Sequence, residues 1–308
     1  MPTAIITAPT AITGAGELPD VAILAGQLAP SSERMYRRDV AAYLAWCQAA
    51  GCAGGAPASL ARYRAHLSAN TAKSPNTINR EIAAIKRLAR EAAAQGLLDS
   101  VAAAQFAALR GVKKLALKSR LKSHTLITPA QMARLVAAPD PRTPLGLRDR
   151  ALLWTLATSG VRVSEAVSLR IDAIEASGAG YLIRVCGKTD VTPRPAPLAP
   201  AAHAAIQAWL VARAPLESPY VFTSTRGQGH QLTGAPLTAT AAWRIVGKYA
   251  ALVGLADVAP HDFRRFVGTQ LAGQDIRKAQ KALGHKNLAT TALYDLAPLA
   301  SGLTDDLF

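Results

Sequence analysis

Apolar side chains recur at the three- to four-residue spacing of amphipathic helices along most of this chain. Between residues 31 and 110 four such stretches follow one another, separated by short turn-rich segments. The clearest starts at Ser74 and Pro75, which suit the cap and first turn of a helix, and ends before Gly96. Its apolar face consists of Ile78, Ile82, Ile85 and Ala89. The pattern predicts a small helical domain in the first third of the chain.

The rest of the chain combines helical periodicity with two short strand-like segments. Helices are predicted from Thr128, over 145–158 and 163–169, and at about 200–213, 237–253, 261–273 and 275–283. Tyr181–Val185 and Pro193–Leu198 flank a turn at Gly187, which is typical of a β-hairpin. We therefore predict a mainly α-helical chain with a small antiparallel β-sheet.

Two stretches fit neither pattern. Residues 1–22, rich in Thr, Ala, Pro and Gly, are expected to form a loose tail. Residues 111–127 carry five basic and no acidic side chains, which favours an extended basic linker, with a solvated helical face as the alternative. The expected organisation is thus a tail, a helical DNA-binding domain over 23–110, this linker, and a larger domain over 128–308.

The charge of the chain indicates an anionic partner. Its 308 residues include 35 Lys and Arg against 20 Asp and Glu, a net charge of +15. Residues 1–127 hold 16 basic and 7 acidic residues, against 19 and 13 in residues 128–308. DNA, RNA or an anionic membrane surface would suit this charge, although a solvated surface without a partner gives the same count. The candidate DNA contacts are Arg34, Arg37, Arg38, Arg80, Lys86, Arg87, Arg90, Lys113, Lys114, Lys118, Arg120 and Lys122.

The cysteines and the uncharged stretches indicate a soluble cytoplasmic protein. Cys47, Cys52 and Cys186 are too few for a disulfide framework and are not spaced like a zinc module, so we expect reduced, buried thiols. No Lys or Arg precedes Arg34, so the basic region of a secretory signal is not seen. Prolines interrupt the uncharged stretch 195–212, and no membrane span is expected.

Short segments of the second part hold reactive side chains. Arg162 stands at the start of a predicted helix, where backbone donors favour an anion. Lys188 falls in the hairpin turn, and His261 and Arg264 share one face of a helix. Taken singly, these are more often ordinary surface residues. Taken alone, His285 is equally well explained as a polar turn residue, and Tyr294 is more often a half-buried packing residue.

Two other interpretations of these segments fail. Gly187 and Lys188 suggest a phosphate-binding P-loop, but Leu182 stands where that motif needs its first glycine. The zinc motif H-E-x-x-H is absent, because no second histidine follows His261 by four residues. We therefore expect no metal and no nucleotide or other cofactor.

Together, in this order and at these intervals, the segments closely resemble the tyrosine recombinases, or phage integrase family. The matching motifs are R-x-x-E (Arg162, Glu165), the hairpin lysine (Lys188), H-x-x-R (His261, Arg264), L-G-H (Leu283 to His285) and the terminal tyrosine (Tyr294). The resemblance covers nearly the whole chain and implies a core-binding domain followed by a mixed α/β catalytic domain. The departures are Thr189 in place of the more usual Gly, dense prolines over 193–200, and Asp295-Leu296 after the tyrosine.

The resemblance implies roles that suit cleavage of a DNA phosphodiester. Arg162 and Arg264 would neutralise the charge that grows in the pentacoordinate transition state. Tyr294 would be the nucleophile and form a 3′-phosphotyrosine link, with His261 as proton acceptor or hydrogen-bonding partner.

The remaining residues would support that step. His285 would add a hydrogen bond to the phosphate, and Lys188 would be the general acid for the departing 5′-oxygen. Glu165 is expected to orient Arg162 rather than to act as an acid.

The implied activity is site-specific recombination in integration, excision or resolution of a mobile element. Its partners would be double-stranded DNA and three further copies of the chain, which form a tetramer on paired DNA sites. Accessory DNA-bending proteins are compatible with this assembly. Two alternatives stay open: a DNA-relaxing enzyme of the type IB kind, and a non-catalytic DNA-binding regulator on the same fold. Loss of a pocket residue would favour the regulator, and all six are present.

Overall fold

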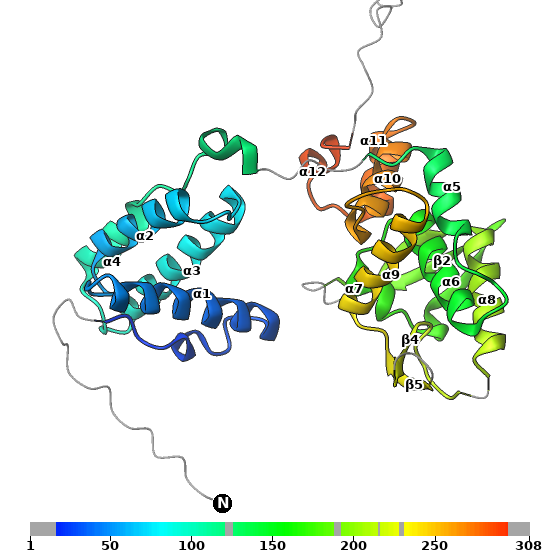
Figure 1. Ribbon diagram of the computed structural model, residues 1–308, viewed down its shortest axis with the longest axis horizontal. Coiled ribbons are helices and arrows are strands. Elements are labelled where there is room, and N and C mark those ends of the chain that lie inside the picture. The colour runs from blue at the N-terminus through cyan, green and yellow to red at the C-terminus, as the bar shows by residue number, and fades with distance from the viewer. Residues whose placement is uncertain (1–16, 121–125, 188–191, 215, 228–230, 295–308) are drawn as a thin grey trace, which may run out of the picture. The chain divides into compact units, whose positions relative to one another are not determined.

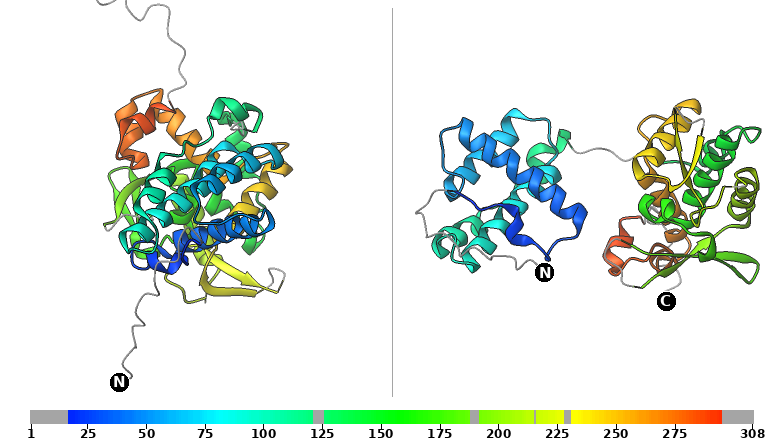
Figure 2. Two further views of the ribbon diagram at one scale, coloured as in Figure 1. Left: turned by 90° about the vertical axis from the view of Figure 1, so that its left-hand side faces the viewer. Right: turned by 90° about the horizontal axis from the view of Figure 1, so that it is seen from below.

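The computed structural model describes residues 17–120, 126–187, 192–214, 216–227 and 231–294. The chain divides into two compact units, residues 1–123 and residues 124–308 (Figure 1 and Figure 2). Within the described ranges, no helix has the length and apolar character needed to cross a membrane.

The first unit is a bundle of helices around α3. Its elements are η1 (Val21–Leu24), α1 (Pro30–Ala49), α2 (Pro57–Asn70), α3 (Pro75–Ala94), α4 (Ser100–Ala108) and η2 (Lys114–Arg120). Ser74 caps α3 as predicted, since its hydroxyl accepts a hydrogen bond from the Thr77 amide. The buried face of α3 packs against α1, α2 and α4, with Tyr43, Leu60 and Phe106 in the shared core.

Two expectations for this unit are wrong in part. Leu18 and Val21 are buried in its core, so the end of the predicted tail is packed structure. The stretch predicted as extended contains the short 3₁₀ helix η2. The Asn79 side chain exchanges two hydrogen bonds with the backbone of Val112 and so ties the beginning of this stretch to α3. Such long-range contacts are not visible in local periodicity.

The second unit joins helices to two small antiparallel sheets. The helices are α5 (Pro129–Ala137), α6 (Pro144–Ser159), α7 (Val163–Val167), η3 (Ile171–Ala173), α8 (Pro200–Ala212), α9 (Ala239–Leu252), α10 (Pro260–Ala272), α11 (Ile276–Leu283) and α12 (Leu288–Ala292). The strands are β1 (Ile174–Ser177), β2 (Gly180–Val185) and β3 (Arg194–Leu198) in one sheet, and β4 (Thr223–Arg226) and β5 (Gln231–Pro236) in the other.

The predicted hairpin is confirmed, whereas the strands β1, β4 and β5 were not predicted from the sequence. β2 pairs with β3 antiparallel, with Val185 opposite Arg194 where the hairpin leaves the sheet. β1 is short and largely exposed, and β4 and β5 are polar with a Gly and a Pro in β5, so none shows apolar alternation. The thiols also differ from expectation, because Cys186 is exposed rather than buried.

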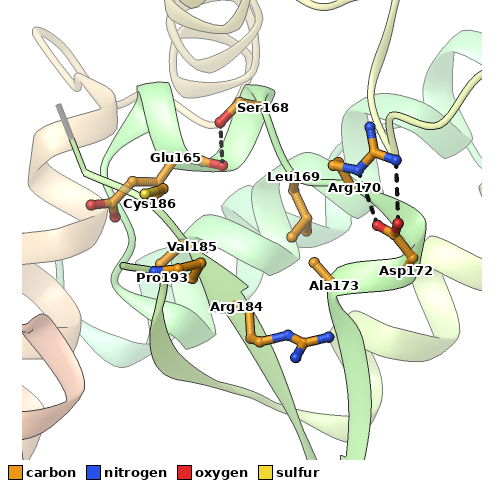
Figure 3. A pocket seen from close by; sticks show the side chains of 10 residues that line it. All are labelled: Glu165, Ser168, Leu169, Arg170, Asp172, Ala173, Arg184, Val185, Cys186 and Pro193. Atoms are coloured by element: carbon orange, nitrogen blue, oxygen red, sulfur yellow. Dashed lines mark hydrogen bonds and ion pairs between the residues drawn. The ribbon is translucent and has the colours of Figure 1, made fainter. Parts of the chain in front are cut away.

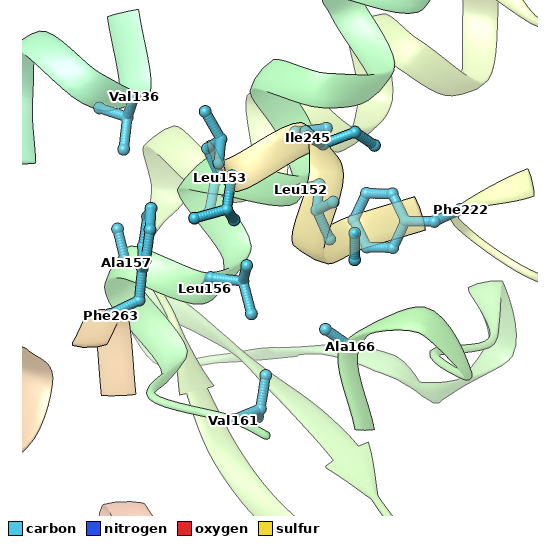
Figure 4. Packing of buried hydrophobic residues seen from close by; sticks show 14 of the residues in the cluster. Val136, Leu152, Leu153, Leu156, Ala157, Val161, Ala166, Phe222, Ile245 and Phe263 are labelled. Atoms are coloured by element: carbon cyan, nitrogen blue, oxygen red, sulfur yellow. The ribbon is translucent and has the colours of Figure 1, made fainter. Parts of the chain in front are cut away.

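The core of the second unit is built around α6. Leu152, Leu153 and Leu156 of this helix are fully buried, and Figure 4 shows them among Phe222 and the side chains of α5, α9 and α10. α6 is buried around most of its circumference, and the charged pair Arg148 and Asp149 is buried with it at 2.8 Å. α6 ends at Gly160 in the left-handed conformation (φ 62°). A Cβ atom there would come within 2.8 Å of the Leu283 side chain, so this end of α6 abuts α11.

Candidate active site

The turn after α6 orients Arg162. This residue caps α7, and its backbone amide donates a 2.8 Å hydrogen bond to Oε2 of Glu165. Its Nη1 atom donates to Oε1 of the same carboxylate at 2.8 Å. Glu165 is fully buried, whereas the Arg162 side chain stays 45% exposed. The guanidinium group is therefore fixed at one end and open to an incoming anion at the other.

Arg264 lies in α10 and joins three segments of the site. It is 2% exposed, and its Nη1 and Nη2 atoms donate 2.7 Å hydrogen bonds to the carbonyl oxygens of Gly160 and Leu283. Burial, and secondarily the positive charge of Arg162, lower the pKa of Arg264 to about 10. The group is still cationic at neutral pH. These two hydrogen bonds use two of its five N–H donors and fix the plane of the guanidinium group.

His285 follows Gly284, the left-handed residue (φ 65°) that ends α11. Its Nδ1 atom shares a 3.0 Å hydrogen bond with the hydroxyl of Thr291. Burial, followed by the charges of Arg264 and Arg162, lowers the pKa of His285 to about 4. The imidazole is therefore neutral at pH 7 and lies in a strongly positive environment.

Tyr294 follows α12 and is buried against α10. Its ring stacks on His285 at a centroid distance of 5.7 Å and an interplanar angle of 12°. A Cβ atom on Gly268 would lie 2.9 Å from Cγ of the tyrosine, so the absence of a side chain at Gly268 makes room for the ring. The charge of a Tyr294 phenolate would also act on Arg264, which places the phenol near this guanidinium group.

The other two predicted catalytic residues are His261 and Lys188. His261 lies exposed in the first turn of α10 and contributes to the lowered pKa of His285, so it belongs to the same cluster. Lys188 lies outside the described residues. The structure thus brings five of the six predicted side chains together, from α7, α10, and the segments that follow α11 and α12.

Arg194 is a residue of the site that the sequence did not identify. It is the first residue of β3 and donates a 3.0 Å hydrogen bond to Oε2 of Glu165. Local sequence around it stands out for its prolines rather than for the arginine. Its isolation could have drawn attention to it, because no other Lys or Arg occurs between Lys188 and Arg213.

A pocket of about 390 Å³ is lined by Glu165 together with residues that follow α7 and residues of the β2–β3 hairpin. Figure 3 shows Glu165 and the hairpin residues Val185, Cys186 and Pro193 on its walls. Of the described catalytic candidates, none lines this pocket, so we do not assign the phosphate to it. Among the residues that the structure describes, no group of three or more His, Cys, Asp or Glu could hold a metal ion.

Several basic residues proposed to contact DNA are engaged within the first unit. Arg37 pairs with Glu33 at 2.8 Å, and both Arg38 and Arg80 pair with the buried carboxylate of Asp39 at 3.1 Å.

Other candidate contacts make backbone contacts or are exposed. Lys86 donates to the carbonyl oxygens of Ala107 and Leu109, and the Arg87 guanidinium lies over the ring of Tyr36. The exposed members are Arg34, Arg90, Lys113, Lys114 and Lys118. Arg120 is half-buried, and Lys122 lies outside the described residues.

Both units match known family models. Residues 125–297 match the phage integrase family, and residues 22–96 match the N-terminal SAM-like domain of phage integrases. The chain belongs to the phage integrase family. It is therefore a tyrosine recombinase, a DNA strand transferase, with the helical N-terminal domain and the catalytic domain of that family.

Relatives of this integrase-family chain are named tyrosine recombinases. XerC of Chromohalobacter salexigens is 30% identical over 281 residues, which cover 88% of this chain and 87% of that protein. XerD of Lacticaseibacillus casei is 29% identical over 276 residues, with 87% and 88% covered. XerD of Neisseria meningitidis serogroup B is 35% identical over 179 residues, which cover 55% of this chain and 57% of that protein.

Solved structures share the integrase fold at low sequence identity. The Tn1549 transposon integrase in complex with circular intermediate DNA has a TM-score of 0.71 at 15% identity, with 93% of this chain and 96% of that chain covered. A lambda integrase dimer bound to a COC′ core site has a TM-score of 0.63 at 16% identity, with 89% and 74% covered. At these identities the likeness establishes the fold.

Proposed function

We propose that this enzyme carries out site-specific DNA recombination through a covalent 3′-phosphotyrosine intermediate at Tyr294. The observation that carries the proposal is the stacking of Tyr294 on His285 at 5.7 Å, beside the buried guanidinium group of Arg264. A nucleophile packed against cationic and neutral hydrogen-bonding groups suits attack on an anionic ester. The DNA seen with the Tn1549 and lambda integrases supports DNA as the substrate.

The two arginines would stabilise the phosphoryl group as its charge grows. Arg162 presents an exposed guanidinium held by Glu165, and two carbonyl oxygens fix the guanidinium group of Arg264. Both groups are fixed before DNA arrives, so little reorganisation is needed in the transition state.

Proton transfer would fall to the remaining members of the cluster. His285, whose pKa of about 4 keeps it neutral at pH 7, would act as a hydrogen-bonding group rather than as a cation. His261 would accept the proton of the Tyr294 phenol, and Lys188 would protonate the departing 5′-oxygen. The new Tyr294–phosphorus bond replaces the phosphorus–O5′ bond, so a second 5′-hydroxyl can reverse the step on another strand.

The two units would divide the work of binding and chemistry. We propose that the first unit, whose core includes Leu18 and Val21, binds DNA, that the basic stretch 111–127 connects it to the second unit, and that residues 128–308 hold the chemistry. Recombination joins two DNA sites, and we propose that four copies of the chain assemble on a pair of such sites. We further propose that the DNA they act on belongs to a mobile element.

A covalent-adduct assay tests the assignment of Tyr294. The probe is a labelled, nicked duplex that carries a site selected from random-sequence DNA by binding to the intact chain. The unmodified enzyme should form a denaturant-resistant adduct, and Tyr294→Phe should bind the same duplex and form none. Tyr220→Phe, a half-buried tyrosine outside the cluster, is the matched control and should react normally. An adduct in Tyr294→Phe would overturn the proposal.

A further inference from the structure

Arg194 bridges three separate elements beside the catalytic cluster. It stands opposite Val185 at the end of the β2–β3 hairpin, the same hairpin that contains Lys188. Its Nη2 atom donates to Oε2 of Glu165 at 3.0 Å, and its Nη1 atom donates to the carbonyl oxygen of Ala282 at 3.0 Å. The side chain is 16% exposed and so is largely withdrawn from solvent. One guanidinium group therefore joins the sheet to α7 and to the end of α11.

The contact with Glu165 links Arg194 to Arg162, because both arginines bind the same carboxylate. The buried carboxylate binds Arg162 through Oε1 and Arg194 through Oε2. A buried carboxylate with two cationic partners has little freedom, because moving it would leave charge without a partner. The orientation of Arg162 toward an incoming phosphate thus depends on a carboxylate that Arg194 holds from the other side.

The contact with Ala282 places Arg194 against the turn that carries His285. Gly284 has a φ of 65°, and a Cβ atom at this residue would overlap Cδ and come within 3.0 Å of Cζ of Arg194. Glycine therefore serves both the left-handed backbone and the close approach of the arginine. The His285 backbone amide donates to the carbonyl oxygen of Gln280, which keeps the histidine in the same turn.

We propose that Arg194 is a positioning residue for strand cleavage. Through Glu165 it aligns Arg162, and through the carbonyl oxygen of Ala282 it aligns the Gly284–His285 turn, so that both are held in place for the phosphate. The inference rests on the proposed covalent mechanism. A guanidinium group is suited to this role because its planar fork reaches two acceptors at fixed angles, which a lysine ammonium does not.

The role predicts a separation between cleavage and binding. Misplacement of catalytic groups by about 1 Å costs on the order of 10²-fold in rate. Arg194→Lys should therefore slow single-turnover cleavage of the nicked duplex about 10²-fold at saturating enzyme. Its dissociation constant for the duplex should stay within about threefold, since Arg194 is mostly buried and contacts protein. Arg184→Ala, which removes an exposed partner of Glu175 from the neighbouring strand, is the matched control and should cleave normally.

A double-mutant cycle distinguishes positioning from general support of the fold. If Arg194 acts through Glu165, the losses of Arg194→Lys and Glu165→Gln overlap, and the double variant is barely slower than the worse single variant. Rates are compared below the melting temperature of every variant. The cycle uses Arg194→Lys rather than Arg194→Ala, because removal of the whole side chain could prevent folding.

The charge and the geometry of Arg194 can also be separated. Arg194 is one of the cations that lower the pKa of His285, after burial, Arg264 and Arg162. Arg194→Lys should keep this pKa low in an NMR titration and still cleave slowly, because the charge remains and the two-point contact is lost.

The outcomes are distinct from those that test the mechanism itself. Cleavage by Arg194→Lys within about threefold of the unmodified enzyme, or losses that multiply with those of Glu165→Gln, would overturn the positioning role. An unmodified enzyme that forms no adduct, or a Tyr294→Phe variant that does, would instead overturn the proposed function.

Discussion

Each unit of this recombinase buries carboxylates among basic side chains, but the balance of charge differs. In the first unit Asp39 and Glu81 are buried and pair with Arg38, Arg80 and Lys73. In the second unit the buried carboxylate of Glu165 lies among arginines of the catalytic cluster. It faces Arg162 and Arg194, and Arg264 lies beside it.

The difference appears in the behaviour of the titrating groups. The positive charge left over in the second unit contributes to lowering the pKa values of Arg264 and His285. Around Asp39 and Glu81 the excess is smaller, because two carboxylates face the three basic side chains Arg38, Arg80 and Lys73, and the Arg38 side chain is 67% exposed to solvent. An uncompensated cluster is a site for an anion, whereas a compensated one mainly stabilises a fold. The number of arginines in a segment does not reveal which of the two it forms.

Removal of Arg264 should produce the largest effect. Arg264→Ala takes away a fixed cation from the phosphoryl site, and single-turnover cleavage should fall about 10³-fold. Arg80→Ala removes an arginine from the compensated cluster and should cleave normally once DNA is saturating. Equal losses in the two variants would remove the distinction between the clusters.

Lys188→Ala should slow cleavage of ordinary DNA by about 10²–10⁴-fold, the range of general acid catalysis. DNA with a bridging 5′-sulfur should restore the rate, because a thiolate leaves without a proton. Arg162→Ala should show less rescue with the same substrate, since its proposed task is to stabilise the phosphoryl charge. If sulfur restores neither variant, the lysine is a phosphate contact and the acid is another residue.

Asp39→Asn should weaken the first unit without touching the chemistry. The change leaves Arg38 and Arg80 without their buried partner, and we expect a loss of about 1–3 kcal/mol in the free energy of unfolding, reduced by the partial exposure of both arginines. Urea unfolding measures this loss. Cleavage at saturating DNA should be unchanged, and a large loss of cleavage would mean that Asp39 supports the active site as well.

The lowered pKa of His285 predicts a stability that falls with acid. The unfolded chain binds this proton near pH 6.5 and the folded chain near pH 4, so the contribution is complete above about pH 6.5 and is lost as the pH falls toward 4. Allowing for solvent screening, we expect about 1–2 kcal/mol between pH 7 and pH 4. His285→Gln should lack this component in urea unfolding at the two pH values. Identical pH dependence in both proteins would show that burial and the nearby cations do not lower the pKa of this histidine in the folded chain.

The smallest effect concerns single phosphate contacts. Lys113→Gln removes an exposed cation and should reduce the slope of log K against log salt by about 0.9, provided that this lysine contacts a phosphate. Arg80→Gln removes a cation that already has a carboxylate partner and should change the slope less. Fluorescence anisotropy with one duplex at several salt concentrations measures both. A larger change for Arg80→Gln would show that its pairing with Asp39 is given up on DNA.

Local sequence determined much of the helical framework and the identity of the reactive groups. Ser74 and Pro75 define the start of α3, and Gly160 and Gly284 end α6 and α11, because caps and left-handed residues act within a few positions of themselves. The order and spacing of the catalytic motifs likewise indicated the family before any coordinates. Helix caps, left-handed residues and motif spacing depend on residues close together in the sequence, so the sequence alone predicts them.

Only the tertiary structure decided which charges meet. Nothing in the local sequence of Arg80 or Arg194 indicates a buried acidic partner, yet one pairs with Asp39, 41 positions away, and the other with Glu165, 29 positions away. The polar strands β4 and β5 and the 3₁₀ helix in the linker were missed for the same reason. Such pairings depend on where packing of the core places distant segments, and hydrophobic periodicity carries no information about the partner of a particular side chain.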